Sequence, residues 1–259
     1  MLLPSAALVI IFSYLPIGGL VMAFKRFNYA DGIFGSPWVG LDNFRFFFES
    51  GKAFTVTRNT ALYNLAFILI NTVLEIAFAI ILSEMAGKWL KKITQSIIFL
   101  PYFISWVIVG SIAYSLLSYE TGTLNGILRA MGVDPINFYG EAGWWPLIIV
   151  AFSAWKGVGY GVVVYLASIL GVDGSLHEAA AIDGANIFQR IRYITIPSIT
   201  PTVITLTLLA LGKIFRGNLD LFYQLVGQNG TLFDKTDVID TYVFRMTIAA
   251  TDVGQTVAI

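Results

Sequence analysis

Five stretches of this chain are apolar for about 20 residues each, the length that an α-helix needs to cross a lipid bilayer. Lipid offers the backbone no hydrogen-bond partner, so only helices and closed barrels can span it. The alternating pattern of a membrane-spanning strand is absent. The sequence therefore predicts an all-α, polytopic transmembrane helical bundle, one membrane domain over residues 1–259. The predicted spans lie near residues 2–24, 61–82, 97–117, 146–170 and 197–215.

Composition agrees with a lipid environment and excludes several kinds of site. Hydrophobic residues make up 57% of the chain and charged residues only 12%, against about 25% charged in an ordinary soluble domain. The net charge is zero, so no nucleic-acid partner is expected. The chain has no cysteine and one histidine, His177, which excludes thiolate chemistry and a histidine-rich metal site.

One polar connection, EAAAIDGANIFQRIRYITIP, covers residues 178–197 between the fourth and fifth apolar runs. Ser175 and Glu178 fit a capping box that would start a helix one residue after the serine. Gly184 can end that helix in a left-handed conformation. A second helix is expected over about residues 185–194, and the proline that closes the stretch opens the next span. The pattern predicts a pair of short helices that either rests on lipid or docks on a protein.

The spacing in this connection resembles a known loop. EAA, three residues, Gly184, nine residues and ITIP resemble the EAA loop of permease subunits in binding-protein-dependent ABC importers. Ile196 stands where the family pattern has leucine, a mild departure. In that family the loop forms a coupling helix that docks in a groove of the ATPase subunit. The resemblance implies a cytoplasmic coupling loop over residues 172–196, with contacts from Glu178, Ala179, Ala180, Asp183, Gly184, Ala185 and Arg190.

The resemblance covers nearly the whole chain. MLLPSAALVIIFSYLPIGGLVMAFK, GSPWVGLDNF, FLPYFISWVIVGSI, WKGVGYG and DVIDTYVFR resemble MalF-like permeases for complex carbohydrates, among them permeases that import alginate. This implies a multi-pass protein of the bacterial inner membrane, with a sixth span after residue 259. It also implies its partners: a second related permease, an ATPase subunit dimer, an extracytoplasmic solute-binding protein, a carbohydrate substrate and membrane lipid. The chain lacks the G-x-x-x-x-G-K-[ST] motif, so ATP and magnesium are expected on the ATPase subunits and no cofactor on this chain.

Basic residues indicate which side the connections face. The connection over residues 83–96 carries three lysines, and the positive-inside rule places it in the cytoplasm. Residues 171–196 lie two connections further on and must face the same side, which their two arginines support. The longer connection over residues 25–60 carries five basic residues and disagrees.

Polar residues within the apolar runs are candidates for a substrate path. Glu75 lies deep in the second run, where an ionisable group is either functional or a structural contact of Asn71. Aromatic rings can stack on sugars, and a lysine such as Lys156 can pair with the carboxylate of an acidic sugar such as alginate. The alternatives are helix packing and snorkelling of lysines to lipid headgroups. The candidate path residues are Trp155, Lys156, Tyr160, Lys213 and Glu75.

Two other protein classes stay open at this point. A secondary transporter needs its own ion-coupling site and often inverted repeats, and no internal repeat is visible. An intramembrane enzyme would have only Glu75, Asp183 and Lys156 as candidates, since the motifs G-x-S-x-G and H-E-x-x-H are absent. The sequence therefore favours a transport subunit of an ABC importer, without catalytic residues.

Overall fold

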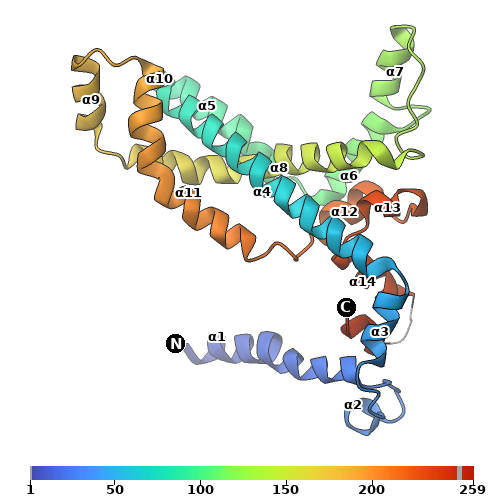
Figure 1. Cartoon of the computed structure of the whole chain (residues 1–259). Coiled ribbons are helices and arrows are strands. Elements are labelled where there is room, and N and C mark those ends of the chain that lie inside the picture. The colour runs from blue at the N-terminus through green and yellow to red at the C-terminus, as the bar shows by residue number, and fades with distance from the viewer. Residues whose placement is uncertain (1, 250–252) are drawn as a thin grey trace. The chain divides into compact units, whose positions relative to one another are not determined.

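The computed structural model describes residues 2–249 and 253–259, and helices form nearly all of the regular structure (Figure 1). Within these residues there is no strand, only an isolated bridge between Lys25 and Trp38. The predicted all-α class is confirmed. The chain divides into two compact units, Met1–Thr60 with Asp237–Ile259 and Ala61–Thr236. The single membrane domain expected over residues 1–259 stays a prediction.

Four helical stretches in the described part are long and apolar enough to cross a membrane. They are Leu3–Phe24, Lys52–Glu84, Ala142–Leu170 and Ile187–Leu211. Three of them contain the first, second and fourth predicted spans, apart from residue 2. The third and fifth differ from the prediction, because one is broken and the other is displaced towards the N-terminus. The sixth span expected after residue 259 stays a prediction.

The first unit, Met1–Thr60 with Asp237–Ile259, begins with an apolar helix whose hydrogen-bond pattern changes before Pro16. Because this proline has no N–H to donate, a wide π-helical turn precedes it and 3-10 turns follow. The elements of the unit are α1 (Leu2–Val9), the π-helical turn (Ile10–Tyr14), the 3-10 helix (Leu15–Phe24), α2 (Gly32–Gly35), α3 (Asp42–Glu49), the start of α4 (Lys52–Glu84), α14 (Ile239–Ile248) and α15 (Val253–Val257).

The core of this unit joins α3, α4 and α14. Phe47, Val56 and Tyr242 are buried against one another. Beside them, the carboxylate of Asp237 accepts two hydrogen bonds from the Arg245 guanidinium, at 3.0 and 2.5 Å. Asp237 is only 4% exposed, so this ion pair neutralises a carboxylate that would be costly to bury alone.

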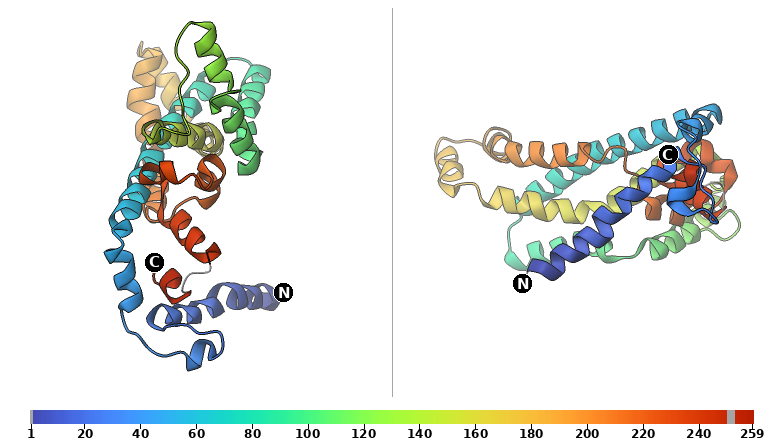
Figure 2. Two further views of the ribbon diagram at one scale, coloured as in Figure 1. Left: turned by 90° about the vertical axis from the view of Figure 1, so that its right-hand side faces the viewer. Right: turned by 90° about the horizontal axis from the view of Figure 1, so that it is seen from below.

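The second unit, Ala61–Thr236, is built around three long helices. Figures 1 and 2 show α4, α8 and α11 running lengthwise, with α9 at one end and α7 at the other. Its elements are the rest of α4, α5 (Lys88–Phe99), a 3-10 turn (Leu100–Phe103), α6 (Trp106–Leu117), α7 (Thr123–Ala130), a 3-10 turn (Ala142–Trp144), α8 (Trp145–Leu170), α9 (Gly174–Ile182), α10 (Ile187–Arg190), a π-helical turn (Ile191–Thr195), α11 (Ile196–Leu211), α12 (Leu219–Val226), a 3-10 turn (Gly230–Leu232) and α13 (Phe233–Thr236).

The core of the second unit lies between the three long helices. Leu82 of α4, Val162 and Tyr165 of α8, and Ile199 of α11 are almost fully buried in one cluster. The other faces of these helices leave many large apolar side chains exposed. Such a distribution suits helices that meet lipid on the outside and one another on the inside.

The third predicted span, 97–117, is not one continuous helix. Lys88–Phe103 and Trp106–Leu117 meet at a bend of 97°. Ile104 and Ser105 between them have extended backbone conformations, and the Ser105 hydroxyl accepts a hydrogen bond from the N–H of Ile108. The serine thus caps a new helix and does not continue the old one.

The fifth predicted span, 197–215, begins ten residues earlier than expected and ends at Leu211. Pro197 does not open the helix, because α10, the π-helical turn Ile191–Thr195 and α11 form one continuous helical stretch. A proline inside a helix removes one hydrogen bond and presses on the preceding turn, and the wide π-helical turn relieves that pressure. The predicted start was therefore wrong.

Candidate functional site

The connection between α8 and α11 contains α9, whose start differs from the prediction. Ser175 does not cap the helix. Asp173 is the N-cap, and its carboxylate accepts a hydrogen bond of 3.0 Å from the N–H of Ser175. The amide and the hydroxyl of Ser175 lower the pKa of the Asp173 carboxyl. Helix α9 therefore begins at Gly174, two residues before the predicted start.

Gly184 ends α9 as predicted. Its φ is +80°, a left-handed conformation that side chains with a Cβ rarely adopt. The N–H of Gly184 donates to the carbonyl of Ala181 at 3.1 Å, and the N–H of Ala185 donates to the carbonyl of Ala180 at 2.9 Å. This pair of bonds is a Schellman motif, which satisfies the last carbonyls of a helix and reverses the chain.

The second short helix begins at Ile187, not at residue 185, because Asn186 caps it. The Asn186 side-chain oxygen accepts a hydrogen bond of 3.0 Å from the N–H of Gln189. In return, the Gln189 side-chain oxygen accepts a hydrogen bond of 2.7 Å from the N–H of Asn186. This reciprocal capping box fixes the direction in which the chain enters α10. Two caps and one glycine turn therefore hold the loop in a defined shape.

The predicted coupling residues divide into two groups. Glu178 and Ala179 are exposed on α9 and do not border the hollow that the other residues line. The other five border a hollow of about 330 Å³ on the surface of the loop. They are Ala180, Asp183, Gly184, Ala185 and Arg190. The hollow is completed by Gln189, Tyr193 and Ile194.

Two apolar side chains on this loop were missed by the sequence reasoning. Ile182, at the end of α9, is 87% exposed, and Phe188, on α10, is 78% exposed. Large apolar groups exposed on such a loop are candidates for contact with a partner or with lipid. Their position on a connection that also carries five charged residues and a histidine was the signal that could have identified them.

Glu75 packs between α4 and α8 at a glycine. A Cβ added at Gly161 would overlap the Glu75 carboxyl, so the missing side chain makes room for the carboxylate. Tyr165, on the same helix as the glycine, lies close to Glu75 and Thr72. Asn71 instead faces Gly157, with 3.9 Å between its amide nitrogen and a Cβ built there. The structure thus places Glu75 in a helix–helix contact, although not in the contact with Asn71 that was considered.

Lys156 and Tyr160 lie together on α8 beside the break between α5 and α6. The Lys156 ammonium donates a hydrogen bond of 2.8 Å to the carbonyl oxygen of Tyr102. The Tyr160 ring stacks on that of Tyr102, with 5.4 Å between ring centroids. Tyr102 and Trp106, which the sequence reasoning did not name, complete this aromatic group around the ammonium.

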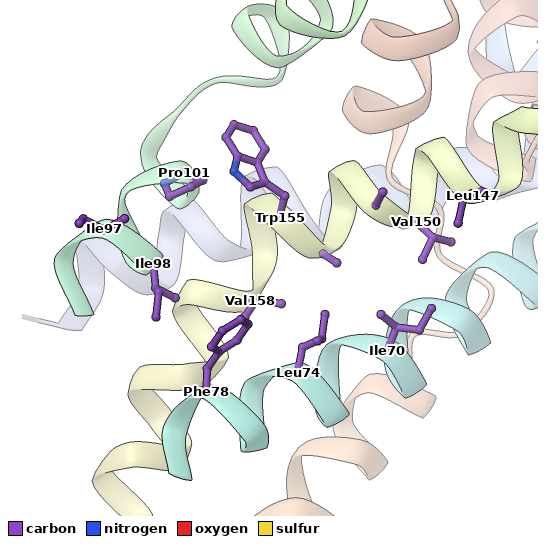
Figure 3. Close-up of a pocket in the computed structure, with 12 residues that line it drawn as sticks. Ile70, Leu74, Phe78, Ile97, Ile98, Pro101, Leu147, Val150, Trp155 and Val158 are labelled. Atoms are coloured by element: carbon purple, nitrogen blue, oxygen red, sulfur yellow. The ribbon is translucent and has the colours of Figure 1, made fainter. Parts of the chain in front are cut away.

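The other two candidate path residues lie elsewhere. Trp155 borders an apolar cavity of about 570 Å³ between α4, α5 and α8, together with Ile70, Leu74 and Phe78 (Figure 3). Lys213 is exposed in the turn after α11 and not within the helix. The structure therefore brings Lys156 and Tyr160 together and leaves Glu75, Trp155 and Lys213 in separate surroundings.

Comparison with known proteins identifies the family. The model of the binding-protein-dependent transport system inner membrane component matches residues 75–251, which is more than half of the chain. The chain belongs to this family. The permease is therefore an inner-membrane transport subunit, and it is neither an intramembrane enzyme nor an unrelated secondary transporter.

Individual relatives and solved structures agree with the family match. Protein LplB of Bacillus subtilis (strain 168) is 34% identical over 248 residues, 96% of the permease and 77% of LplB. The polygalacturonan/rhamnogalacturonan transport system permease protein YteP of the same organism is 32% identical over 244 residues, 94% of the permease and 75% of YteP.

Two solved structures extend the agreement to the fold. A bacterial ABC transporter involved in the import of the acidic polysaccharide alginate has a chain with a TM-score of 0.89 and 34% identity, covering 99% of the permease and 86% of that chain. A chain of the bacterial alginate ABC transporter, solved in complex with an alginate pentasaccharide-bound periplasmic protein, has a TM-score of 0.88 and 32% identity. The match covers 100% of the permease and 84% of that chain. The expected ABC importer permease fold is confirmed.

Proposed function

We propose that the permease is one transmembrane subunit of an ABC importer that moves an oligo- or polysaccharide across the bacterial inner membrane by ATP-driven alternating access. The observation that carries the proposal is the capped, exposed loop over residues 172–196 on a chain of this family. The carbohydrate class is supported by the relatives, which include a polygalacturonan/rhamnogalacturonan permease and an alginate transporter. An acidic saccharide such as alginate agrees with both of these relatives.

The partners follow from the same proposal. A second, related permease forms the other half of the path, and an extracytoplasmic binding protein delivers the sugar. A dimer of ATPase subunits binds ATP and magnesium and docks on the loop over residues 172–196. Exposed Ile182 and Phe188 supply apolar contact area for that docking.

The substrate path includes the aromatic group beside the break in the third span. Tyr160 and Tyr102 offer stacking area for a sugar ring, and Lys156 places a cation between rings. A carboxylate that crosses a low-dielectric region needs a partner, because burying it unpaired is costly. Glu75, Trp155 and Lys213 remain candidates for other parts of the path.

The proposal is tested by purification of the intact transporter and by ATP hydrolysis assays with matched acidic and neutral oligosaccharides. We expect the permease to co-purify with a second permease and the ATPase subunits, and the binding protein loaded with acidic sugar to stimulate hydrolysis. Purification as a lone protein, or hydrolysis that no saccharide stimulates, would overturn the proposal.

Replacing Lys156 or Lys213 by Met tests the acidic substrate. If a lysine pairs with the carboxylates of the sugar, its loss removes a charge-assisted hydrogen bond, which contributes roughly 1.5–3 kcal/mol. We expect the ratio of acidic to neutral oligosaccharide transport to fall about tenfold in the variant that lines the path. The measurement is uptake of both sugars into proteoliposomes, and an unchanged ratio in both variants would assign both lysines a structural role.

Replacing Gly184 by Val tests the shape of the loop. A β-branched residue at a φ of +80° costs roughly 1–3 kcal/mol of backbone strain, so the turn between α9 and α10 should open. We expect at least a severalfold loss of co-purified ATPase subunit, with the spanning helices intact by circular dichroism. Gly184→Asn is the matched control, since asparagine tolerates this conformation. Normal assembly of Gly184→Val would contradict the assignment.

A further inference from the structure

The break between α5 and α6 leaves a helix end inside a membrane-spanning region. The 3-10 turn Leu100–Phe103 ends where Ile104 becomes extended, and α6 begins at a bend of 97°. The last carbonyls of a helix have no partner within it, and in lipid an unsatisfied carbonyl costs several kcal/mol. A break within a membrane-spanning segment is therefore stabilised by partners from outside the broken segment.

Lys156 of α8 contacts both arms of the break. Its ammonium donates a hydrogen bond of 2.8 Å to the carbonyl oxygen of Tyr102, which precedes the break. It also lies 5.5 Å from the centroid of the Tyr102 ring and 5.2 Å from that of Trp106, the first residue of α6. A cation is favourable at a helix C-terminus, because that end carries partial negative charge. Its contacts with two rings add cation–π attraction.

The backbone of α8 is pressed against the same end of α5. A Cβ added at Gly159 would lie 2.5 Å from the carbonyl oxygen of Ile98 and 2.7 Å from Cα of Phe99. This close approach places Lys156, three residues earlier, within reach of the next turn of the neighbouring helix. Gly159 thus sets the distance between the helices, and the lysine spans the break.

We propose that Lys156 is a positioning residue that fixes the angle of the broken third span by holding Tyr102 on one arm and Trp106 on the other. The two arms then keep one angle before any sugar arrives. The proposal concerns this chain alone and does not depend on which sugar is carried. It differs from the charge-pairing role proposed above, which predicts a change in substrate preference.

The experiment measures the angle directly, because the chain has no native cysteine that would have to be removed first. Spin labels are attached at Lys92→Cys on α5 and Ser115→Cys on α6, two exposed positions on opposite arms. Pulsed electron paramagnetic resonance then gives the distance distribution in the assembled transporter, without nucleotide and without sugar. In the parent protein we expect one narrow distribution.

Lys156→Met should broaden or shift the distribution, whereas Lys156→Arg should restore it, since arginine also donates to a carbonyl and packs on aromatic rings. Lys235→Met is the matched control, because it removes an exposed lysine outside the contact group and should leave the distance unchanged. Trp106→Leu removes one contact and keeps the lysine, so an intermediate broadening is expected even if Lys156→Met does not assemble. A parent-like distribution in Lys156→Met, or in Trp106→Leu, would overturn the proposal.

Discussion

Phe188→Asp is expected to abolish transport and to reduce the amount of ATPase subunit that co-purifies with the permease by more than tenfold. Phe188 is a large side chain, 78% exposed, on a helix whose start is fixed by a capping box. Aromatic anchors in the centre of an interface commonly contribute 2 kcal/mol or more to binding. A carboxylate at this position would also have to be desolvated on docking.

Two further variants show which property of the loop matters. Phe188→Leu keeps an apolar side chain and should retain most of the docking. Glu178→Lys, on the exposed face of α9, should uncouple sugar-stimulated hydrolysis from transport if this carboxylate meets a basic or polar group of the ATPase subunit. Docking in Phe188→Asp equal to that of the parent would place the ATPase contact elsewhere on the chain.

Gly161→Leu is expected to lower the thermal stability of the permease, because it displaces a carboxyl from a packed helix–helix contact. Even a Cβ at this position would overlap the carboxyl of Glu75, so a leucine would have to displace that carboxyl from the contact between α4 and α8. Inserting side-chain atoms into a packed contact commonly costs about 1–3 kcal/mol, and more where the backbone must move. The measurement is the thermal unfolding midpoint and the elution profile of the purified variant.

The same pair of helices offers a matched control. Gly157→Ala places its Cβ 3.9 Å from the amide nitrogen of Asn71, an ordinary contact distance, so it should be tolerated. Combining Gly161→Ala with Glu75→Ala should recover part of the stability lost in Gly161→Ala alone, because the overlapping carboxyl is gone. Equal stability of Gly161→Leu and the parent would show that the two helices do not rely on this close packing.

Local signals in the sequence predicted much of this structure. Apolar runs of the right length identified the membrane helices, since the requirement to cover the backbone in lipid depends only on residue type and length. Gly184 was predicted in its left-handed conformation, because a glycine after a short helix has a local reason to adopt it. The helix start was missed by two residues, because Asp173 competes with Ser175 for the same cap.

The break in the third span could not be predicted in the same way. Pro101 lies in that run, but a proline restricts only its own φ and the residue before it. The segment bends by 97°, and the contacts across the bend come from Lys156, which lies 54 positions after its partner Tyr102. The exposure of Ile182 and Phe188 is likewise a property of the folded loop, since the same residues could have been turned inward.

The continuous helix from Ile187 to Leu211 has a mechanical consequence. It joins the loop surface to the membrane region as one helical stretch, which contains the π-helical turn Ile191–Thr195 and Pro201, and its 25 residues at about 1.5 Å per residue make a rod of roughly 37 Å. If such a rod pivots at its loop end, a tilt of about 10° moves its far end by roughly 6 Å, which is about one helical turn. If the helix moves as one body, a small rotation imposed on the loop reaches Leu211 as a displacement wide enough to separate two side chains that were in contact.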